Sequence, residues 1–171
     1  MKQKISAGLA IVYDNKLLLG HPTNSRWYNS YSIPKGGLEK GESYLDAAIR
    51  ETSEEVGVNV PKSLIDKTEH HFSSSSKKHK YNKTVYYYVV KIDDLSQIGL
   101  NDLVIPKNQL QLKEIDWAGF LSIDEINKRV TPSQTTLINN LIGKGLLENT
   151  ILNFKDYERI WERRSLKGGS Q

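Results

Sequence analysis

The chain has 171 residues, 37% of them apolar and 26% charged, which is enough for one hydrophobic core and too few for two ordinary ones. It contains no cysteine, which excludes disulfides, thiolate metal sites and cysteine nucleophiles. No apolar run approaches the ~20 residues of a membrane span, and the first run ends at Asp14 without a signal-peptide cleavage site. We therefore expect one cytoplasmic domain over residues 1–171 and no membrane partner. The net charge of +4 favours an anionic partner, such as a nucleotide, a phosphate or nucleic acid.

The first third of the chain predicts three strands and one helix. Ser6–Tyr13 and Lys16–Leu19 are predicted strands that flank an Asp-Asn turn, and Tyr28–Ile33 is a predicted short strand before a proline. Ser43–Val56 is predicted to be helical, because a serine that can cap it is followed three residues later by an aspartate. Gly57 is expected to end this helix.

The rest of the chain adds further strands and three short helices. The predicted strands are Ser63–Ser73, Thr84–Ile92 and Glu114–Leu121. The predicted helices begin at the capping boxes Ser122…Glu125 and Thr131…Gln134, and a last amphipathic helix spans about Phe154–Arg164 within a C-terminal extension and tail, about 147–171. The segment 93–113 is long for a loop and is expected to be an insertion or a flap. Strands on both sides of one central helix predict an α+β domain with a mixed sheet.

The predicted central helix carries an unusual group of acidic residues. Glu51, Glu54 and Glu55 are spaced i, i+3 and i+4, so they are neighbours on the helix surface and repel one another. Two of them lie near the helix C-terminus, where the macrodipole disfavours anions. A hard divalent cation such as Mg²⁺ would resolve this conflict, whereas a solvated acidic face is the alternative. Arg50, four residues before Glu54, can balance the charge and fix a carboxylate rotamer.

The loop before this helix favours the metal site over the solvated face. It contains the run Pro34-Lys35-Gly36-Gly37, whose glycines allow the backbone to approach a ligand closely. Lys35 can meet a phosphate as a point charge. Gly41 permits a second bend just before Glu42.

Read at full length, this region resembles the signature box of the Nudix hydrolases. Gly36 is followed after five residues by Glu42 and after seven more by the run Arg50–Val58, which reads RETSEEVGV. Every charged and glycine position of the pattern matches. Thr52 stands where an aliphatic residue is usual, on the core stripe of the helix. Because the motif is long and its spacing is fixed, it is far more specific than a pair of glycines.

The resemblance implies a mixed sheet sandwiched between helices, and hydrolysis of a pyrophosphate bridge in a nucleoside diphosphate derivative. It implies Mg²⁺ or Mn²⁺ bound by Glu51, Glu54 and Glu55, with the carbonyl of Gly36 or Gly37 completing the shell. Glu51 is then also a candidate general base, and Arg50 would hold the carboxylates in place. Phosphoryl transfer needs charge neutralisation and positioning, which such a site supplies.

A weaker resemblance concerns the substrate. The Pro-Lys-Gly loop and the stretch KTVYYYVVKIDD resemble the branch that cleaves diadenosine tetraphosphate, so we expect a dinucleoside polyphosphate. The alternatives are RNA 5′ ends, diphosphoinositol polyphosphates and oxidised deoxynucleoside triphosphates. A rival of another class is a non-catalytic Nudix module that binds nucleotide or RNA, although such a binder has no need of the three glutamates.

Several residues could choose the substrate. Tyr31 stands where similar sequences often carry a tryptophan, so its ring could stack on a base or belong to the core, whereas Tyr28 is expected in the core. Tyr86 and Tyr88 should share one face of their strand, opposite Tyr87. One of these two faces is expected to meet the ligand cleft, and Tyr86 and Tyr88, like Gly37, are expected to bind the substrate. His70 and His71 are expected to be structural. The lysines of 77–83 and the basic C-terminal residues are expected to be solvated, although the former could reach a long phosphate chain.

A fourth carboxylate is less easily placed. Many Nudix enzymes use a glutamate six residues before a tryptophan of a late strand, and here that position before Trp117 is Gln111. The nearest glutamate is Glu114, which strand alternation would place with Asp116 and opposite Trp117, as an exposed residue.

Overall fold

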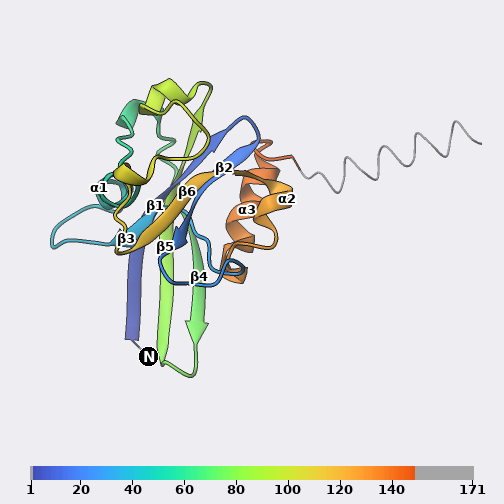
Figure 1. Cartoon of the computed structure of the whole chain (residues 1–171). Coiled ribbons are helices and arrows are strands. Elements are labelled where there is room, and N and C mark those ends of the chain that lie inside the picture. The colour runs from blue at the N-terminus through green and yellow to red at the C-terminus, as the bar shows by residue number, and fades with distance from the viewer. Residues whose placement is uncertain (1, 149–171) are drawn as a thin grey trace, which may run out of the picture.

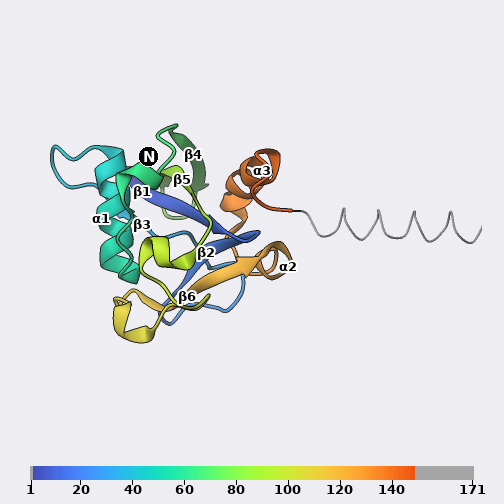
Figure 2. The same cartoon turned by 90° about the horizontal axis from the view of Figure 1, so that it is seen from above.

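The computed structural model describes residues 2–148, which form one mixed sheet with helices on both faces (Figures 1 and 2). The strands are β1 (Lys2–Tyr13), β2 (Lys16–Pro22), β3 (Lys35–Gly37), β4 (His70–Ser76), β5 (Tyr81–Ile92) and β6 (Ile115–Ser122). The helices are α1 (Tyr44–Val56), α2 (Ile123–Ile126) and α3 (Thr135–Gly143). The predicted α+β fold class is confirmed. The helix expected at Phe154–Arg164 lies outside the described residues.

Strand β1 is the centre of the sheet. The strand order is β4-β5-β1-β2-β6, and β3 pairs with β1 off this path. β1 runs parallel to β5 over twelve residue pairs, from Lys2↔Tyr81 to Tyr13↔Ile92, and antiparallel to β2 and β3. The β1–β2 turn is the predicted Asp14-Asn15 dipeptide, and both residues have positive φ (46° and 61°), as a two-residue hairpin requires.

The two faces of the sheet carry separate cores. On one face, α1 packs its Ala47, Ala48 and Val56 against apolar side chains of β1 and β5. On the other, α3 packs its Leu137, Ile138 and Leu141 against the opposite side of the same strands. Figure 2 shows this sandwich end on, with α1 and α3 on opposite sides of the strands.

The segment 93–113 belongs to the α1 side. It contains two short 3-10 helices, Leu95–Ile98 and Lys107–Gln109, and is anchored by side chains buried in that core: Ile98, Leu100, Ile105 and Leu110. It is therefore a cover held by apolar contacts and not a free flap.

Two strand predictions were wrong in part. Tyr28–Ile33 makes only isolated bridges at Tyr31 and Ser32, because Asn29 has a left-handed backbone (φ 50°) that interrupts an extended strand. Tyr28, expected in the core, is 55% exposed.

The strand expected over Ser63–Ser73 begins only at His70. The residues before it form a 3-10 turn at Lys62–Leu64 and one isolated bridge, Ile65↔Val90. The side chain of Asp66 then accepts a hydrogen bond from the backbone N–H of Thr68, which competes with strand pairing. Within residues 2–148, no helix has the length and apolar character needed to cross a membrane.

Candidate functional site

The loop between β3 and α1 brings the signature residues together. β3 pairs antiparallel with β1, with Gly36 opposite Ala7. A Cβ atom on Gly36 would lie 2.1 Å from the carboxyl carbon of Glu51, so only glycine allows that carboxylate to rest against the strand. At the start of α1, the Ser43 hydroxyl accepts a hydrogen bond from the N–H of Asp46, and Gly57 ends the helix with φ 68°, as predicted.

Arg50 connects four parts of this loop and helix. Its Nε and Nη2 donate to the two carboxylate oxygens of Glu42, at 2.8 and 2.9 Å. Its Nη1 donates to Glu51 at 2.9 Å and to Glu54 at 3.1 Å, which is the contact expected from the i, i+4 spacing. Its Nη2 also donates to the carbonyl of Gly37 at 2.8 Å. One guanidinium thus fixes the loop, two glutamates of α1 and a backbone carbonyl.

Glu55 lies one helical turn after Glu51 and is buried. It is only 7% exposed, and burial raises the pKa of its carboxyl above the usual range. The charge of Lys35 opposes that rise, whereas the charges of Glu114 and Glu51 add to it. Burial likewise lowers the pKa of Lys35, and the nearby ammonium of Lys83 lowers it further. The three predicted glutamates therefore divide into two that contact Arg50 and one that faces Lys35.

Glu51 connects the two sides. Burial raises the pKa of its carboxyl, its hydrogen bond from Arg50 lowers it, and the charges of Glu54 and Glu114 raise it. Glu114 is exposed, as expected, but it lies in the turn before β6 and not in the strand. The alternation argument fails there because turn residues do not alternate. The sequence therefore did not predict that Glu114 lies close enough for its charge to raise the pKa of both Glu51 and Glu55.

The ligand chemistry of this site suits a hard divalent cation. The charge of Glu114 raises the pKa of both Glu51 and Glu55, and such a group of like charges is what Mg²⁺ or Mn²⁺ neutralises. Over the described part of the chain, no three acidic or histidine side chains already converge as metal ligands. The donors therefore fit the ion by their chemistry, while Arg50 holds Glu51 and Glu54 in the present arrangement.

A cavity of about 510 Å³ lies beside Lys35, on the α3 face of the sheet. Lys83, Tyr81 and Phe72 also line it, together with hydroxyl groups from the 131–133 segment. Its two ammonium groups repel each other, so an anion bound between them would be stabilised. The buried side chain of Gln134 closes one wall and bonds the backbone of Tyr31 and Ile33.

The predicted substrate-binding tyrosines do not lie in that cavity. Tyr86 and Tyr88 share the α1 face, as expected: Tyr86 stacks on Tyr44 with ring centroids 4.2 Å apart, and the Tyr88 hydroxyl donates to Glu69 at 2.8 Å. Tyr31 is 3% exposed in the α3-side core, so it presents no ring face for a base to stack on.

An exposed aromatic residue lies nearby instead. Trp27 is 60% exposed and stacks on the buried ring of His21, with centroids 3.6 Å apart. His21 is held by the carboxylate of Asp116 at 2.5 Å and by the carbonyl of Arg26 at 2.9 Å. The sequence pattern did not indicate this arrangement, because the partners come from two distant strands.

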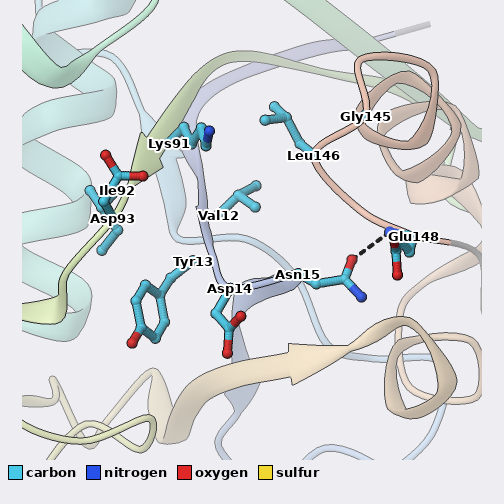
Figure 3. Close-up of a pocket in the computed structure, with 10 residues that line it drawn as sticks. All are labelled: Val12, Tyr13, Asp14, Asn15, Lys91, Ile92, Asp93, Gly145, Leu146 and Glu148. Carbon is cyan, nitrogen blue, oxygen red and sulfur yellow. Dashed lines mark hydrogen bonds between the residues drawn. The ribbon is translucent and has the colours of Figure 1, made fainter.

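A second cavity, of about 560 Å³, lies at the opposite end of β1 (Figure 3). Residues around the β1–β2 turn line it, including Tyr13 and Asp14, and Asn15 accepts a hydrogen bond there from the backbone of Glu148. It contains none of the predicted site residues.

The Arg50–Glu42 pair makes a prediction for stability. Its hydrogen bonds lower the pKa of the Glu42 carboxyl to about 2, from the model-peptide value of 4.5. The ionised pair therefore stabilises the folded state above pH 4.5, and this contribution is lost as the pH falls towards 2. Urea denaturation should show Glu42→Gln less stable than the parent protein at pH 7, with a gap that narrows below pH 4.5.

Glu39→Gln is the matched control, because that carboxylate is 68% exposed and 3.8 Å from Arg50. It should change stability little at any pH. A Glu42→Gln gap of constant size from pH 7 to pH 3 would contradict the role given to this pair.

Known proteins resemble this chain over the region that contains the signature loop and helix. The family model of the NUDIX domain matches residues 2–141. An RNA pyrophosphohydrolase from Sulfurovum sp. (strain NBC37-1) is 28% identical over 142 residues, covering 80% of this chain and 85% of that protein. The structure of a MutT NUDIX hydrolase from Burkholderia pseudomallei has a TM-score of 0.60 at 16% identity, covering 80% of this chain and 97% of that one.

The binary complex of a C. elegans Ap4A hydrolase has a TM-score of 0.51 at 22% identity, covering 71% of this chain and 82% of that one. These structural likenesses concern the fold. The family match spans most of the chain and includes the loop and helix on which the structure gathers Gly36, Glu42, Arg50 and the glutamates. The chain therefore belongs to the NUDIX hydrolase family.

Proposed function

We propose that the protein hydrolyses a pyrophosphate linkage in a nucleoside 5′-polyphosphate, with the help of Mg²⁺ or Mn²⁺, in the cytoplasm. One observation carries the proposal: Glu51 and Glu55 lie within electrostatic reach of each other and of Glu114, beside a lysine that lines a cavity. This observation supports a site in which anionic metal ligands would lie next to a cationic group that binds phosphate, as phosphoryl transfer requires.

The metal would be held by Glu51, Glu54 and Glu55, with the carbonyl of Gly36 as a further ligand. The bound ion would neutralise charge on the phosphate oxygens and lower the pKa of a coordinated water. The Gly37 carbonyl is less suited to this role, because it already accepts a hydrogen bond from Arg50.

The chain's own groups supply the remaining requirements. Glu51 accepts a proton from the attacking water as the general base. The water oxygen bonds to phosphorus as the bridging P–O bond breaks and the phosphate group leaves. Lys35 holds that phosphate, and Arg50 fixes the orientation of Glu51.

Two substrates are supported. A dinucleoside polyphosphate such as diadenosine tetraphosphate is favoured by the resemblance of the Pro-Lys-Gly loop, and the C. elegans Ap4A hydrolase shares the fold. A 5′-triphosphorylated RNA is favoured by the RNA pyrophosphohydrolase relative, which covers 80% of the chain. Both present a chain of phosphates attached to a 5′ carbon.

A substrate panel tests the proposal. We expect turnover of diadenosine tetraphosphate or 5′-triphosphorylated RNA with Mg²⁺ or Mn²⁺, measured by chromatography of the products. Diphosphoinositol polyphosphate and an oxidised deoxynucleoside triphosphate complete the panel. Glu55→Gln, the inactive control, should be slower by about 10²–10³ or more, because it removes a metal-binding charge. Tight ligand binding without hydrolysis of any compound would support a non-catalytic binding module instead.

The choice of base predicts a contrast between two glutamates. Glu114→Gln should lower kcat less than tenfold, which corresponds to under about 1.4 kcal/mol of barrier. Glu51→Gln should lower it far more, because it removes the proton acceptor. Rapid-quench assays at saturating substrate would measure both. A Glu114→Gln enzyme that binds metal and substrate normally but is a thousandfold slower would make Glu114 the base.

The adjacent glycines of β3 provide a matched pair of variants. Gly36→Ala would place a Cβ atom 2.1 Å from the Glu51 carboxyl carbon, so the carboxylate must move while the backbone need not. Gly37→Ala meets nothing within 4 Å. We expect Gly36→Ala to fold normally by thermal denaturation and to lose about 10²-fold or more in kcat, as misplacement by about 1 Å can cause. Equal activities of the two variants would exclude a catalytic position for Glu51.

A further inference from the structure

One end of the sheet is basic without any acidic residue. We define the lysine arm as residues 2–5 of β1 together with residues 74–84, the tip of the β4–β5 hairpin. It contains six lysines and no aspartate or glutamate: Lys2, Lys4, Lys77, Lys78, Lys80 and Lys83. Without these six of the 24 Lys and Arg, the other 18 face 20 Asp and Glu. The arm therefore accounts for the net positive charge of the chain.

The arm is a built part of the sheet. β1 and β5 run side by side through it, with Lys2 opposite Tyr81 and Lys4 opposite Lys83. At the bottom of Figure 1 these strands extend beyond α1 and α3. The ammonium of Lys4 lies 5.1 Å from the centre of the Tyr81 ring, and His79 stacks on the same ring at 6.3 Å. Cationic and aromatic groups are thus interleaved along one projecting ladder.

The arm is continuous with the candidate active site. Lys83 and Tyr81 line the same cavity as Lys35. Lys35 pairs with Gly8 of β1, and Tyr81 pairs with Lys2, six residues away along the same strand. At the rise of a strand this separation is about 20 Å. A phosphate at Lys35 therefore marks the start of a basic path about 20 Å long.

We infer that the lysine arm binds the first nucleotides of a single-stranded RNA whose 5′-polyphosphate lies at Lys35. The inference rests on the proposed function and specifies the substrate of that site. Lysines neutralise successive backbone phosphates, and an aromatic ring between them offers a surface on which a base stacks without sequence preference. At the ~3.4 Å stacking distance of one strand, about 20 Å accommodates about six nucleotides. A free mononucleotide at Lys35 would reach only the near end of the arm, at Lys83 and Tyr81.

Binding without turnover provides the first test. Fluorescence anisotropy in EDTA would follow a labelled eight-nucleotide RNA with a 5′-hydroxyl, for the full chain and for Lys77→Gln/Lys78→Gln/Lys80→Asn. Asparagine is chosen at position 80 because that residue has φ 52°. We expect the variant to bind about 10- to 100-fold more weakly at low salt, and the salt dependence to lose about two units of slope.

Lys67→Gln/Lys107→Gln/Lys128→Gln is the matched control. It removes the same charge at exposed lysines outside the arm. It should keep the slope of the parent protein. An unchanged slope in the arm variant, or an equal loss in the control, would overturn the inference. So would arm-dependent binding to anionic phospholipid vesicles with RNA binding unaltered.

Kinetics provide the second test. For 5′-triphosphorylated RNAs, KM should fall as the length rises to about six nucleotides and then level off. The arm variant should lose this dependence while its kinetics with diadenosine tetraphosphate stay within twofold. If no pyrophosphate is hydrolysed but RNA binding depends on the arm, the proposed function fails and the arm stands as an RNA-binding surface without a substrate role. If hydrolysis is normal and RNA binding ignores the arm, only the inference fails.

Discussion

The guanidinium of Arg50 holds the candidate site together. It donates to two glutamates of its own helix, to Glu42 in the preceding loop and to the carbonyl of Gly37. Charge-assisted, bidentate hydrogen bonds of this kind define the geometry of the groups as well as stabilising them. They tie the glycine loop to the helix, in addition to the pairing of β3 with β1 and the cap at Ser43. The position of Glu51 against Gly36 depends on the Arg50 hydrogen bond and on the pairing of β3.

The site is assembled from charges that are unfavourable alone. The carboxylates of Glu51, Glu55 and Glu114 oppose one another, and the ammonium groups of Lys35 and Lys83 do the same. Folding tolerates this because the apolar cores on the two sheet faces supply the stability. A polyphosphate with its cation would satisfy both groups at once, since the cation meets the carboxylates and the phosphates meet the lysines. The carboxylate and ammonium charges that the folded chain leaves uncompensated therefore largely specify the binding partner.

Local features of the fold could be predicted from the sequence, and features that depend on distant contacts could not. The cap at Ser43, the stop at Gly57 and the turn at Asp14-Asn15 were all predicted correctly, since each is determined by a few neighbouring residues. The i, i+4 contact between Arg50 and Glu54 was predicted for the same reason. The alternation of Tyr86, Tyr87 and Tyr88 follows from strand geometry alone.

The remaining features depend on tertiary packing. Helical periodicity predicted that Glu51 and Glu55 are neighbours, but it could not predict that Glu55 is buried near Lys35, which comes from β3 outside the helix. Glu114 was placed by strand parity, yet its backbone forms a turn in which Ile115 bonds back to Gln111. The stack of Trp27 on His21 depends on Asp116, 95 residues away from the histidine in sequence. Periodicity within one segment cannot report such contacts.

The parallel pairing of β1 with β5 has a consequence for how the chain is made. β1 is the central strand, yet its longest partner, β5, ends only at Ile92. Lys2 therefore cannot pair until Tyr81 has been synthesised. Closing so large a loop costs conformational entropy before the contacts between β1 and β5 can form. Topologies of this kind therefore fold slowly. During synthesis, β1 can pair with β2 and the short β3 on one edge, but its other edge stays unpaired until β5 has left the ribosome. The edge of β1 that β5 covers in the folded protein is therefore exposed at first, and wrong pairing and aggregation can compete with folding there.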